Sequence, residues 1–521
     1  MKTFSPLKRR ESTTDGHGWT RIFSKSKFLK FFIRVYPCSS VVKKFFLVVF
    51  AFSWLFLISA GCAVGPNYKR PSINTPETFR GESEISTNSF ANLPWRQVFH
   101  DDTLQNLIRT ALTNNYDLRI AVTRVEQARA MAAEARAGFF PQLDYAATAA
   151  RGQNVGGGNA PSPTGTIGNV FAADVNASWE IDLWGRIRRL NESARAQFFA
   201  SEEARRDVMI SLIGEVAQNY FQLLALDRQL EIARESTNSF GESLNIFNER
   251  LQGGVASKLE TSSAEALMDA AAATIPVLEE QVAVQENQLS VLLGQNPGAI
   301  LRGNVSLEKQ ASPEVPAGLP SALLEGRPDI REAEQQLRSA TAQVGVAKAD
   351  FFPQLNLTGL FGNVSSDLTT FTSGGGDVAW SIAAGLTGPL FHGGELRAQY
   401  AQARAAREQA ALQYQETVLN AFEEISDALI SREKSAAARA QQSRAVDAYK
   451  VAVKISLERY RMGHADYYEV LQEQQLLFPA ENSLLQFQLN QLLAVVQLYR
   501  ALGGGWEAEA TIILPPPTHG Q

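Results

Sequence analysis

The chain has 521 residues and a formal net charge of −5, with 45% hydrophobic and 20% charged residues. This composition is typical of a folded protein and excludes a chain that is disordered throughout. No basic patch of the nucleic-acid-binding type stands out beyond the N-terminal region, so we expect no nucleic-acid partner. The two cysteines, Cys38 and Cys62, lie outside the expected folded body, which excludes a disulfide framework.

The N-terminal region contains an uncharged apolar stretch at residues 45–60, preceded by two lysines. The stretch is shorter than the roughly 20 residues of a membrane-spanning helix and suits the apolar core of a signal peptide. Ser59-Ala60-Gly61 then lead into Cys62, which resembles a bacterial lipobox. We interpret 1–61 as a signal region and Cys62 as an acylated mature N-terminus, with an N-acyl group such as palmitate and an S-diacylglycerol.

Two further observations bear on this N-terminal region. Residue 63 is Ala rather than Asp, which implies export to the outer membrane in bacteria that retain lipoproteins by an Asp there. Residues 1–41 are too long for an ordinary basic region, and a start at Val41 or Val42 would give a signal peptide of usual length. The alternative is a membrane anchor helix that ends at an incidental cysteine.

Self-similarity is the strongest signal in the rest of the chain. Asp117-Leu118-Arg119 and Phe139-Phe140-Pro141-Gln142-Leu143 both recur at an offset of 212, as Asp329-Ile330-Arg331 and Phe351-Phe352-Pro353-Gln354-Leu355. Glu249-Arg250, Gly254 and Glu260 recur at an offset of 209 as Glu458-Arg459, Gly463 and Glu469. Such ordered matches indicate two copies of one unit. We assign 62–100 to a lipid-anchored segment, 101–300 to repeat 1, 301–506 to repeat 2, and 507–521 to a disordered tail.

Each repeat is expected to begin with a helix of roughly 25–30 residues that ends at the Phe-Phe-Pro motif, because proline stops a helix. Two strands should follow, separated by loops at 152–168 and 362–377 that are rich in Gly, Ser and Thr. The long strand at 169–183 carries one apolar face, formed by Phe171, Ala173, Val175, Ala177, Trp179, Ile181 and Leu183. Its counterpart carries Val378, Trp380, Ile382, Ala384, Leu386 and Leu390. Shorter strands are expected near 143–151 and 355–362.

Strict alternation predicts strands with one buried or lipid-facing side. A soluble antiparallel sheet would also satisfy this pattern. The long strands reach the roughly 9–11 residues that a transmembrane strand needs. Strands in lipid must close into a barrel, and four per chain are too few, whereas three chains would supply twelve.

The longest predicted helix spans 395–462, a stretch without Gly or Pro, and would extend roughly 100 Å. Its repeat-1 equivalent is 186–252. A seam at coiled-coil spacing runs through Leu396, Tyr400, Ala403, Ala410, Tyr414, Ala421, Ile425 and Ala428. Each long helix should reverse at a glycine, Gly254 or Gly463. The returning helices are expected at 257–293 and 466–502, kinked or broken at Pro276 and Pro479.

These features together resemble the TolC-like outer-membrane efflux proteins, in particular the NodT-type lipoprotein subgroup, over about residues 62–506. The resemblance rests on the paired Phe-Phe-Pro-Gln-Leu motifs, on Gly65-Pro66-Asn67-Tyr68 and on Leu502-Gly503-Gly504-Gly505-Trp506. It implies a mainly α, internally duplicated fold with a long coiled-coil barrel. It also implies four transmembrane strands per chain that close as a 12-stranded β-barrel in a trimer.

The resemblance further implies the exit duct of a tripartite efflux pump, held in outer-membrane lipid with its helices in the periplasm. The duct would passively conduct drugs or other small molecules delivered by an inner-membrane pump, of the resistance-nodulation-division type. Tip turns carrying Arg250, Gly254, Arg459 and Gly463 would dock a periplasmic adaptor protein. The position that matches the family's acidic gate residue is Gln472, so that role does not carry over. Tyr468, Glu469 and Glu473 are the nearby gate candidates, and an ordinary solvated helix face is the alternative.

No motif indicates an enzyme. The chain lacks a metalloprotease HExxH, a phosphate-binding loop and a nucleophile elbow. His392 and Glu395 are expected to be turn residues rather than metal ligands, and we expect no metal and no cofactor. Two other functions stay open, namely the duct of a type I protein-secretion system and a periplasmic coiled-coil scaffold without a pore.

Overall fold

The computed structural model describes residues 63–76, 78–81, 93–153, 167–303, 306–310 and 325–504. All of them belong to one compact unit, Cys62–Gln521, which is separate from the unit Met1–Gly61. Cys62, the signal region, most of the loop 152–168 and the tail 507–521 therefore lie outside the described residues.

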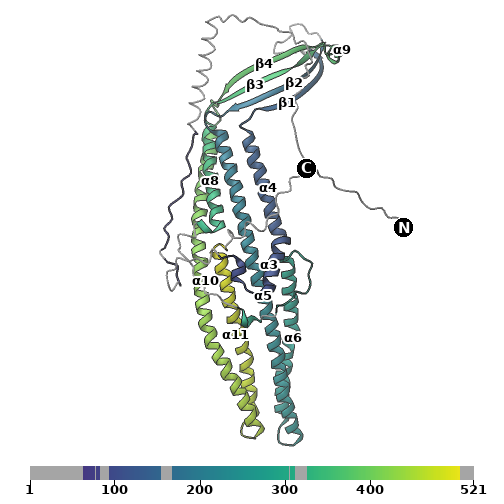
Figure 1. The fold of residues 1–521 in the computed structure, drawn as a ribbon, viewed down its shortest axis with the longest axis vertical. Helices are drawn as coiled ribbons and strands as arrows, with labels where there is room; N and C mark the ends of the chain where they lie inside the picture. The colour runs from purple at the N-terminus through teal and green to yellow at the C-terminus, as the bar shows by residue number, and fades with distance from the viewer. Residues whose placement is uncertain are drawn as a thin grey trace, which may run out of the picture. The chain divides into compact units, whose positions relative to one another are not determined.

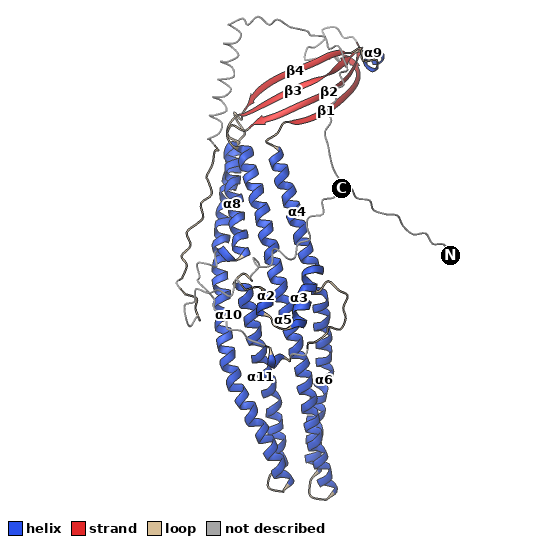
Figure 2. Ribbon diagram, in the orientation of Figure 1, coloured by secondary structure: helices blue, strands red, loops and turns tan. Residues whose placement is uncertain are grey.

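The strands form one antiparallel sheet in the order β1-β2-β3-β4, drawn red in Figure 2. They are β1 (Gln142–Gln153), β2 (Ile167–Ile181), β3 (Gln354–Ser365) and β4 (Asp377–Thr387). The first strand of repeat 1 is shorter than the second, as expected, with 12 residues against 15, whereas in repeat 2 this expectation was wrong, because β3 has 12 residues and β4 has 11. Pairing with β2 and β4 makes β1 and β3 longer than their weaker alternation of apolar and polar residues indicates. Leu390, expected on a strand, lies beyond the end of β4.

Two helices of 67 residues each follow the sheet, α5 (Arg186–Gln252) and α10 (Glu395–Arg461). At 1.5 Å per residue each extends about 100 Å. Both begin after a glycine in the left-handed conformation, Gly185 or Gly394, which allows the chain to turn sharply from strand into helix. Figure 1 shows these helices continuing away from the sheet.

The returning helices are α6 (Lys258–Leu292) and α11 (Tyr467–Ala501), each of 35 residues. Ser257 and Glu260 form a capping box at the start of α6, and the Asp466 side chain accepts from the Tyr467 N–H at the start of α11. The expected break at the prolines was wrong, because both helices continue through Pro276 and Pro479. A proline removes only one intrahelical donor, and packing along the rest of the helix preserves its course.

The first helices of the repeats are α4 (Tyr116–Ala137) and α8 (Pro328–Ala349), each of 22 residues. They are shorter than expected and end before the Phe-Phe-Pro motif. In repeat 1, α2 (Trp95–Val98) and α3 (Asp102–Asn114) come before α4, and Asn115 separates α3 from α4 by capping the Leu118 N–H. Two shorter elements are η2 (Leu307–Lys309) and α9 (Leu368–Thr372).

Equivalent hydrogen bonds join the start of α4 to the end of α6 and the start of α8 to the end of α11. The Asn115 amide donates to the Leu292 carbonyl at 3.0 Å, and the Arg327 guanidinium donates to the Ala501 carbonyl at 2.8 Å. Leu292 and Ala501 are the last residues of α6 and α11, and they differ by the repeat offset of 209. Each bond satisfies a helix-terminal carbonyl that has no partner within its helix. The internal duplication is thus present in the three-dimensional contacts as well as in the sequence.

The core lies where the helices of the two repeats pack together. Helix α5 contacts α4, α6, α8 and α11, while α10 contacts α8 and α11. The largest side chains that this packing buries completely include Trp95, Tyr220, Tyr414 and Tyr499. The predicted seam is buried along its second half, at Tyr414, Ala421, Ile425 and Ala428, and is partly exposed along its first half. None of the helices within the described ranges combines the length and apolar character of a membrane span.

Candidate functional site: sheet face, strap and hairpin tips

One face of the sheet is apolar and exposed. Antiparallel pairing places Tyr145 opposite Val175, Val175 opposite Phe361, and Phe361 opposite Trp380. Directly paired residues point to the same face, so four strands contribute to one surface. Its large exposed members are Leu143, Tyr145, Val175, Phe361, Val378, Trp380, Ile382 and Leu386. A contiguous apolar surface of this extent indicates contact with a membrane or with another protein.

The opposite face of the sheet is polar. It carries Asp174, Asn176, Ser178 and Glu180 on β2 together with Asn356 and Thr358 on β3. This face borders a hollow of about 820 Å³ whose helical lining includes Glu134, Gln197 and Gln343. Apolar side chains such as Met131, Phe140 and Leu190 also line this hollow, so polar and apolar groups together connect the sheet to the helices.

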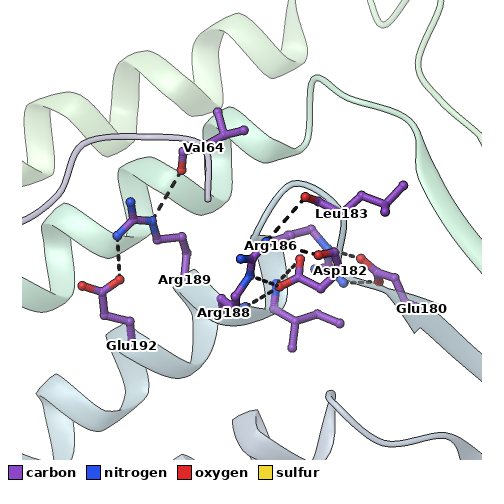
Figure 3. Close-up of polar contacts among 9 residues, drawn as sticks. Val64, Glu180, Asp182, Leu183, Arg186, Arg188, Arg189 and Glu192 are labelled. Carbon is purple, nitrogen blue, oxygen red and sulfur yellow. Dashed lines mark hydrogen bonds and ion pairs between the residues drawn. The ribbon is translucent and has the colours of Figure 1, made fainter. Parts of the chain in front are cut away.

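The junction between β2 and α5 is fixed by charged side chains, as Figure 3 shows. Arg186 forms a bidentate pair with Glu180 through contacts of 2.9 and 2.5 Å. The Asp182 carboxylate accepts the backbone N–H groups of Ile187 and Arg188 at 3.2 and 2.9 Å. Carboxylates are stabilised at helix N-termini by such free N–H groups. The junction thereby holds the long helix rigidly on the strand.

An N-terminal strap, residues 63–76 and 78–81, lies across this junction and the helices beside it. The Val64 N–H donates to the Trp184 carbonyl at 2.9 Å, and Arg189 donates to the Asn67 side chain at 2.6 Å. Further along, Tyr68 and Arg70 both donate to the buried Glu334 carboxylate of α8, at 3.0 and 2.6 Å. The strap thus links α5 to α8 through buried polar contacts.

Glycines allow the strap to approach closely. Gly65 has a φ of +105°, and a Cβ added there would lie 2.5 Å from the Gly345 Cα. A Cβ on Gly185 would lie 2.7 Å from the Ala63 Cα. The residue that follows Cys62 therefore lies against the start of α5, at the end of the sheet. The Gly-Pro-Asn-Tyr motif supplies these contacts, which the sequence alone did not reveal.

We expect Gly345→Ala to displace the strap. A Cβ at this position would lie 2.8 Å from the Arg189 Cγ, and Arg189 is already held by Asn67 and Glu192. Overpacking of this kind costs about 1–3 kcal/mol. Limited proteolysis of the purified protein should cleave within the strap faster than in wild type. Gly214→Ala is the control, because its Cβ would meet only ordinary contacts at 3.7 Å; equal cleavage in both variants would contradict the prediction.

The two long helices reverse at the two glycine turns that the sequence predicts. Gly254 and Gly463 have φ values of +72° and +79°, and no atom lies within 4 Å of a Cβ added to either. Arg459 donates to the His464 carbonyl at 3.1 Å and lies 3.5 Å from the Glu469 carboxylate. Arg250 points instead to the other hairpin and donates to the Tyr460 carbonyl at 2.5 Å.

Tyr460 connects the two hairpins, a role that sequence reasoning missed. Its hydroxyl donates to the Glu260 carboxylate of α6 at 2.8 Å, and the Arg250 guanidinium lies 4.4 Å from its ring centroid. Phe247 packs edge-on against the same ring at 4.8 Å. Burial and the Glu260 carboxylate raise the pKa of Tyr460, so its hydroxyl stays protonated and can donate. Glu260 was recognised only as a repeated residue.

The gate candidates lie on the first two turns of α11. Tyr468 and Gln472 are exposed, while Glu469 and Glu473 are partly exposed. The adjacent Gln474 is buried and links α11 to α5, through contacts of 3.1 Å with Ser243 and 2.8 Å with Ser239. Among the predicted tip residues, Arg250 links the two hairpins, whereas Tyr460 and Gln474 are links that lie next to the predicted Arg459 and Glu473.

A polar pocket of about 120 Å³ lies between α5, the start of α8 and the end of α11. Arg327 bridges Asp329 and Glu424 there, at 2.6 and 2.8 Å. Burial, together with Asp207 and Asp329, raises the pKa of the nearby Glu332 carboxyl to about 7. Among the described residues, no group of three or more His, Cys, Asp or Glu is arranged to hold a metal. His392 and Glu395 lie 3.6 Å apart at the start of α10.

Glu332 should make folding stability depend on pH. The folded chain keeps this proton up to pH about 7, whereas an unfolded glutamate loses it near its usual pKa of about 4.3. The stability contribution is therefore full below that value and falls as pH rises through 7. We expect Glu332→Gln to raise the thermal unfolding midpoint at pH 8 but not at pH 4. Glu416→Gln, at an exposed position on α10, is the control; a pH-independent effect of Glu332→Gln would contradict the assignment.

Known proteins share both the sequence and the structure of this chain. The sequence model of a family described as outer membrane efflux protein matches residues 107–295 and 319–504. The chain is 36% identical over 458 residues to the solvent efflux pump outer membrane protein SrpC of Pseudomonas putida, covering 86% of this chain and 97% of that protein. It is 32% identical over 456 residues to the cation efflux system protein CusC of Escherichia coli K12, covering 86% and 97%.

The fold is also found in a solved structure of the outer-membrane channel OprN. The match has a TM-score of 0.79 and 31% sequence identity, and it covers 86% of this chain and 100% of the other. The similarity therefore extends over nearly all the residues that the structure describes.

Proposed function

The chain belongs to the outer membrane efflux protein family and is an outer-membrane component of an efflux pump, and we propose that three copies form its exit duct. In this proposal the four strands of each copy contribute to a 12-stranded barrel in the outer membrane. The long helices form a periplasmic tunnel beneath it. The related SrpC and CusC are efflux components, which supports efflux over the secretion-system alternative.

The observation that carries the proposal is the sheet with one mainly apolar exposed face, continuous with 67-residue helices. The apolar face suits lipid, because the bilayer core excludes exposed polar groups. The polar face and the hollow beside it would border the solute pathway. The relatives are channel and efflux proteins rather than enzymes, and we infer that this chain conducts solutes passively without catalysis, metal or cofactor.

The proposed partners would bind at the periplasmic end of the duct. The hairpin tips around Gly254 and Gly463 would dock a periplasmic adaptor, whose other end contacts an inner-membrane pump. Arg250 and Arg459 would contribute to this docking, although Arg250 also donates a hydrogen bond to the Tyr460 carbonyl. Gating would involve the first turns of α11, including Tyr468, Glu469, Gln472 and Glu473. The two repeats would span 101–300 and 301–506, joined by the β2–β3 pairing.

Acylation of Cys62 would anchor each copy in the same membrane. Ala63 lies against Gly185 at the end of the sheet, so an acyl chain on the preceding residue would enter lipid beside the strands. Two or more acyl chains give stable anchoring, since each buried CH₂ contributes about 0.8 kcal/mol. We expect Cys62→Ala to lose the mass of the diacylglycerol and N-acyl groups in intact-mass analysis. If wild type and Cys62→Ala differed in mass only by the substituted side chain, this result would contradict acylation at Cys62.

The function is tested by the conductance of the purified mature protein in planar bilayers, with the oligomer mass measured in the same preparation. A trimer that gives discrete channels is expected, even if the channels are small because the tips are closed. A monomer or dimer without channels would exclude the duct and favour a periplasmic scaffold.

A further inference from the structure

We propose that the hollow between the sheet and the helices is a binding site for an aromatic organic cation on its way through the duct. This inference rests on the proposed function and deepens it, because it names a class of solute and the place that holds it. The hollow has a volume of about 820 Å³, and its lining comes mainly from β2, β3, α4 and α5 of a single copy. Small-molecule sites in proteins are concave and have volumes of about 300–1,000 Å³.

Two helices each present one face to the hollow. On α4 the lining includes Met131 and Glu134, and on α5 it includes Leu190, Ala194 and Gln197. Both sets follow the spacing of three and four residues that places side chains on the same side of a helix. The helical wall is therefore formed by the regular surface of two long elements rather than by a loop, which gives the site a fixed shape.

The hollow and the strap lie on opposite sides of α8. Gln343 lines the hollow, whereas Gly345 admits the strap through its close approach to Gly65. Two residues along a helix correspond to a rotation of about 200°, so these two positions point in nearly opposite directions. The hollow thus faces away from the strap and lies on the side of the polar sheet face. A solute in the proposed duct would reach it where the helices end and the strands begin.

Large apolar side chains in the hollow are incompletely covered. Met131, Phe140 and Leu190 are 48%, 60% and 36% exposed, respectively. Trp179 also lines the hollow, and its indole N–H donates to the Phe139 carbonyl at 3.1 Å, which fixes the orientation of the ring. Aromatic rings and the methionine thioether make favourable contacts with aromatic groups. A flat aromatic solute would therefore remove apolar surface of the protein and its own apolar surface from water.

The charges of the lining favour a cation. The charged side chains there are Glu134, Glu180 and Arg186. Arg186 binds Glu180 in a bidentate pair, so these two charges neutralise each other. Within the described parts of the chain, Glu134 takes part in no ion pair, which leaves the hollow with one uncompensated negative charge. A cation placed there would be attracted by this carboxylate and by the face of the Phe140 ring, whereas an anion would be repelled.

The site is expected to bind weakly, as a transport pathway requires. Glu134 is exposed, and an ion pair at an exposed position changes affinity by no more than about fivefold. Uncharged polar side chains such as Gln197, Asn356 and Thr358 keep part of the lining hydrated. A conducting pathway needs sites that solutes enter readily and also leave. The hollow would thus retain aromatic cations briefly without trapping them.

Two dyes of opposite charge test the site on the purified mature protein in nanodiscs of zwitterionic lipid. Ethidium and fluorescein are both fused-ring aromatic dyes with a pendant phenyl ring, but ethidium is a cation and fluorescein is an anion at neutral pH. Fluorescence polarisation should show saturable binding of ethidium and weaker binding of fluorescein. Met131→Ala should lower the affinity for both dyes by about two- to tenfold, because it removes a contact with the aromatic rings.

Glu134→Lys should reverse the preference between the dyes. Inverting this charge should lower the affinity for ethidium by about fivefold and raise the affinity for fluorescein. A gain of fluorescein binding cannot result from misfolding, so this variant separates the site from a loss of structure. Glu126→Lys is the matched control, because Glu126 is exposed on the same helix and does not line the hollow. It lies about 12 Å along α4 from Glu134, beyond the screening distance of about 8 Å at physiological salt.

The outcomes distinguish the site from the duct. Ethidium binding that Glu134→Lys leaves unchanged, or that Glu126→Lys weakens equally, would overturn the site. Equal binding of the two dyes by the wild-type protein would also overturn it, as would the absence of saturable ethidium binding in protein that conducts in planar bilayers. Wild-type protein that forms no channels would instead count against the proposed function.

Discussion

Ile382→Arg is expected to prevent assembly of the protein in the outer membrane. Ile382 lies in the middle of β4 on the apolar sheet face, with 83% of its side chain exposed in the single copy. An arginine on the lipid-facing side of a transmembrane strand costs about 2–4 kcal/mol at the bilayer midplane. This cost arises once in each copy of the oligomer, so even the lower value lowers the assembled fraction about 30-fold or more.

The neighbouring residue supplies the control. Ser381 lies on the opposite, polar face of the same strand, where Ser381→Arg should border water rather than lipid. The measurement is the amount of heat-modifiable oligomer in the outer-membrane fraction, together with the efflux that the cells retain. If Ile382→Arg assembled to the same amount as the wild-type protein, this result would contradict the assignment of this face to lipid. Equal loss in both variants would instead show that β4 tolerates no arginine on either face.

Tyr460→Phe combined with Arg250→Ala is expected to open the hairpin tips. Together these changes remove two of the links between the hairpins, the hydroxyl contact to Glu260 and the guanidinium contact to the Tyr460 carbonyl, and leave the Gln474 contacts with Ser239 and Ser243 in place. Hydrogen bonds to charged groups contribute about 1.5–3 kcal/mol each. Loss of one such bond shifts a closed–open equilibrium by about tenfold or more, and loss of both shifts it further.

The readout for the tip is open probability and conductance in planar bilayers, with the amount of assembled protein unchanged. Tyr449→Phe is the control, because Tyr449 lies on α10 about three turns before the tip and is partly exposed. Wild-type conductance in the double variant, or an equal increase in Tyr449→Phe, would exclude Tyr460 as the link that holds the tip closed. Glu260 keeps its bond to the Ser257 N–H in these variants, so the start of α6 should remain capped.

The predictions made from sequence succeeded where the signal is local or periodic. Both long helices begin at the expected residues, because the chain between the starting and ending glycines contains no helix-stopping proline. The apolar faces of β2 and β4 follow from strict alternation, and Gly254 and Gly463 mark the reversals because a left-handed residue is needed there. The relation between the repeats was also contained in the sequence, since it needs only the recurrence of short motifs at fixed offsets.

Tertiary structure decided what depends on contacts between distant residues. The full lengths of β1 and β3 come from pairing with β2 and β4, and α6 and α11 continue through Pro276 and Pro479. The strap on Glu334 and the Tyr460 link join residues separated by 200 positions or more. Such contacts leave no periodic trace in the chain, because they depend on which helix faces meet and how closely backbones can approach. The sequence by itself therefore determined the repeated elements, and packing between those elements decided the register, the strap and the side chains that hold the tips together.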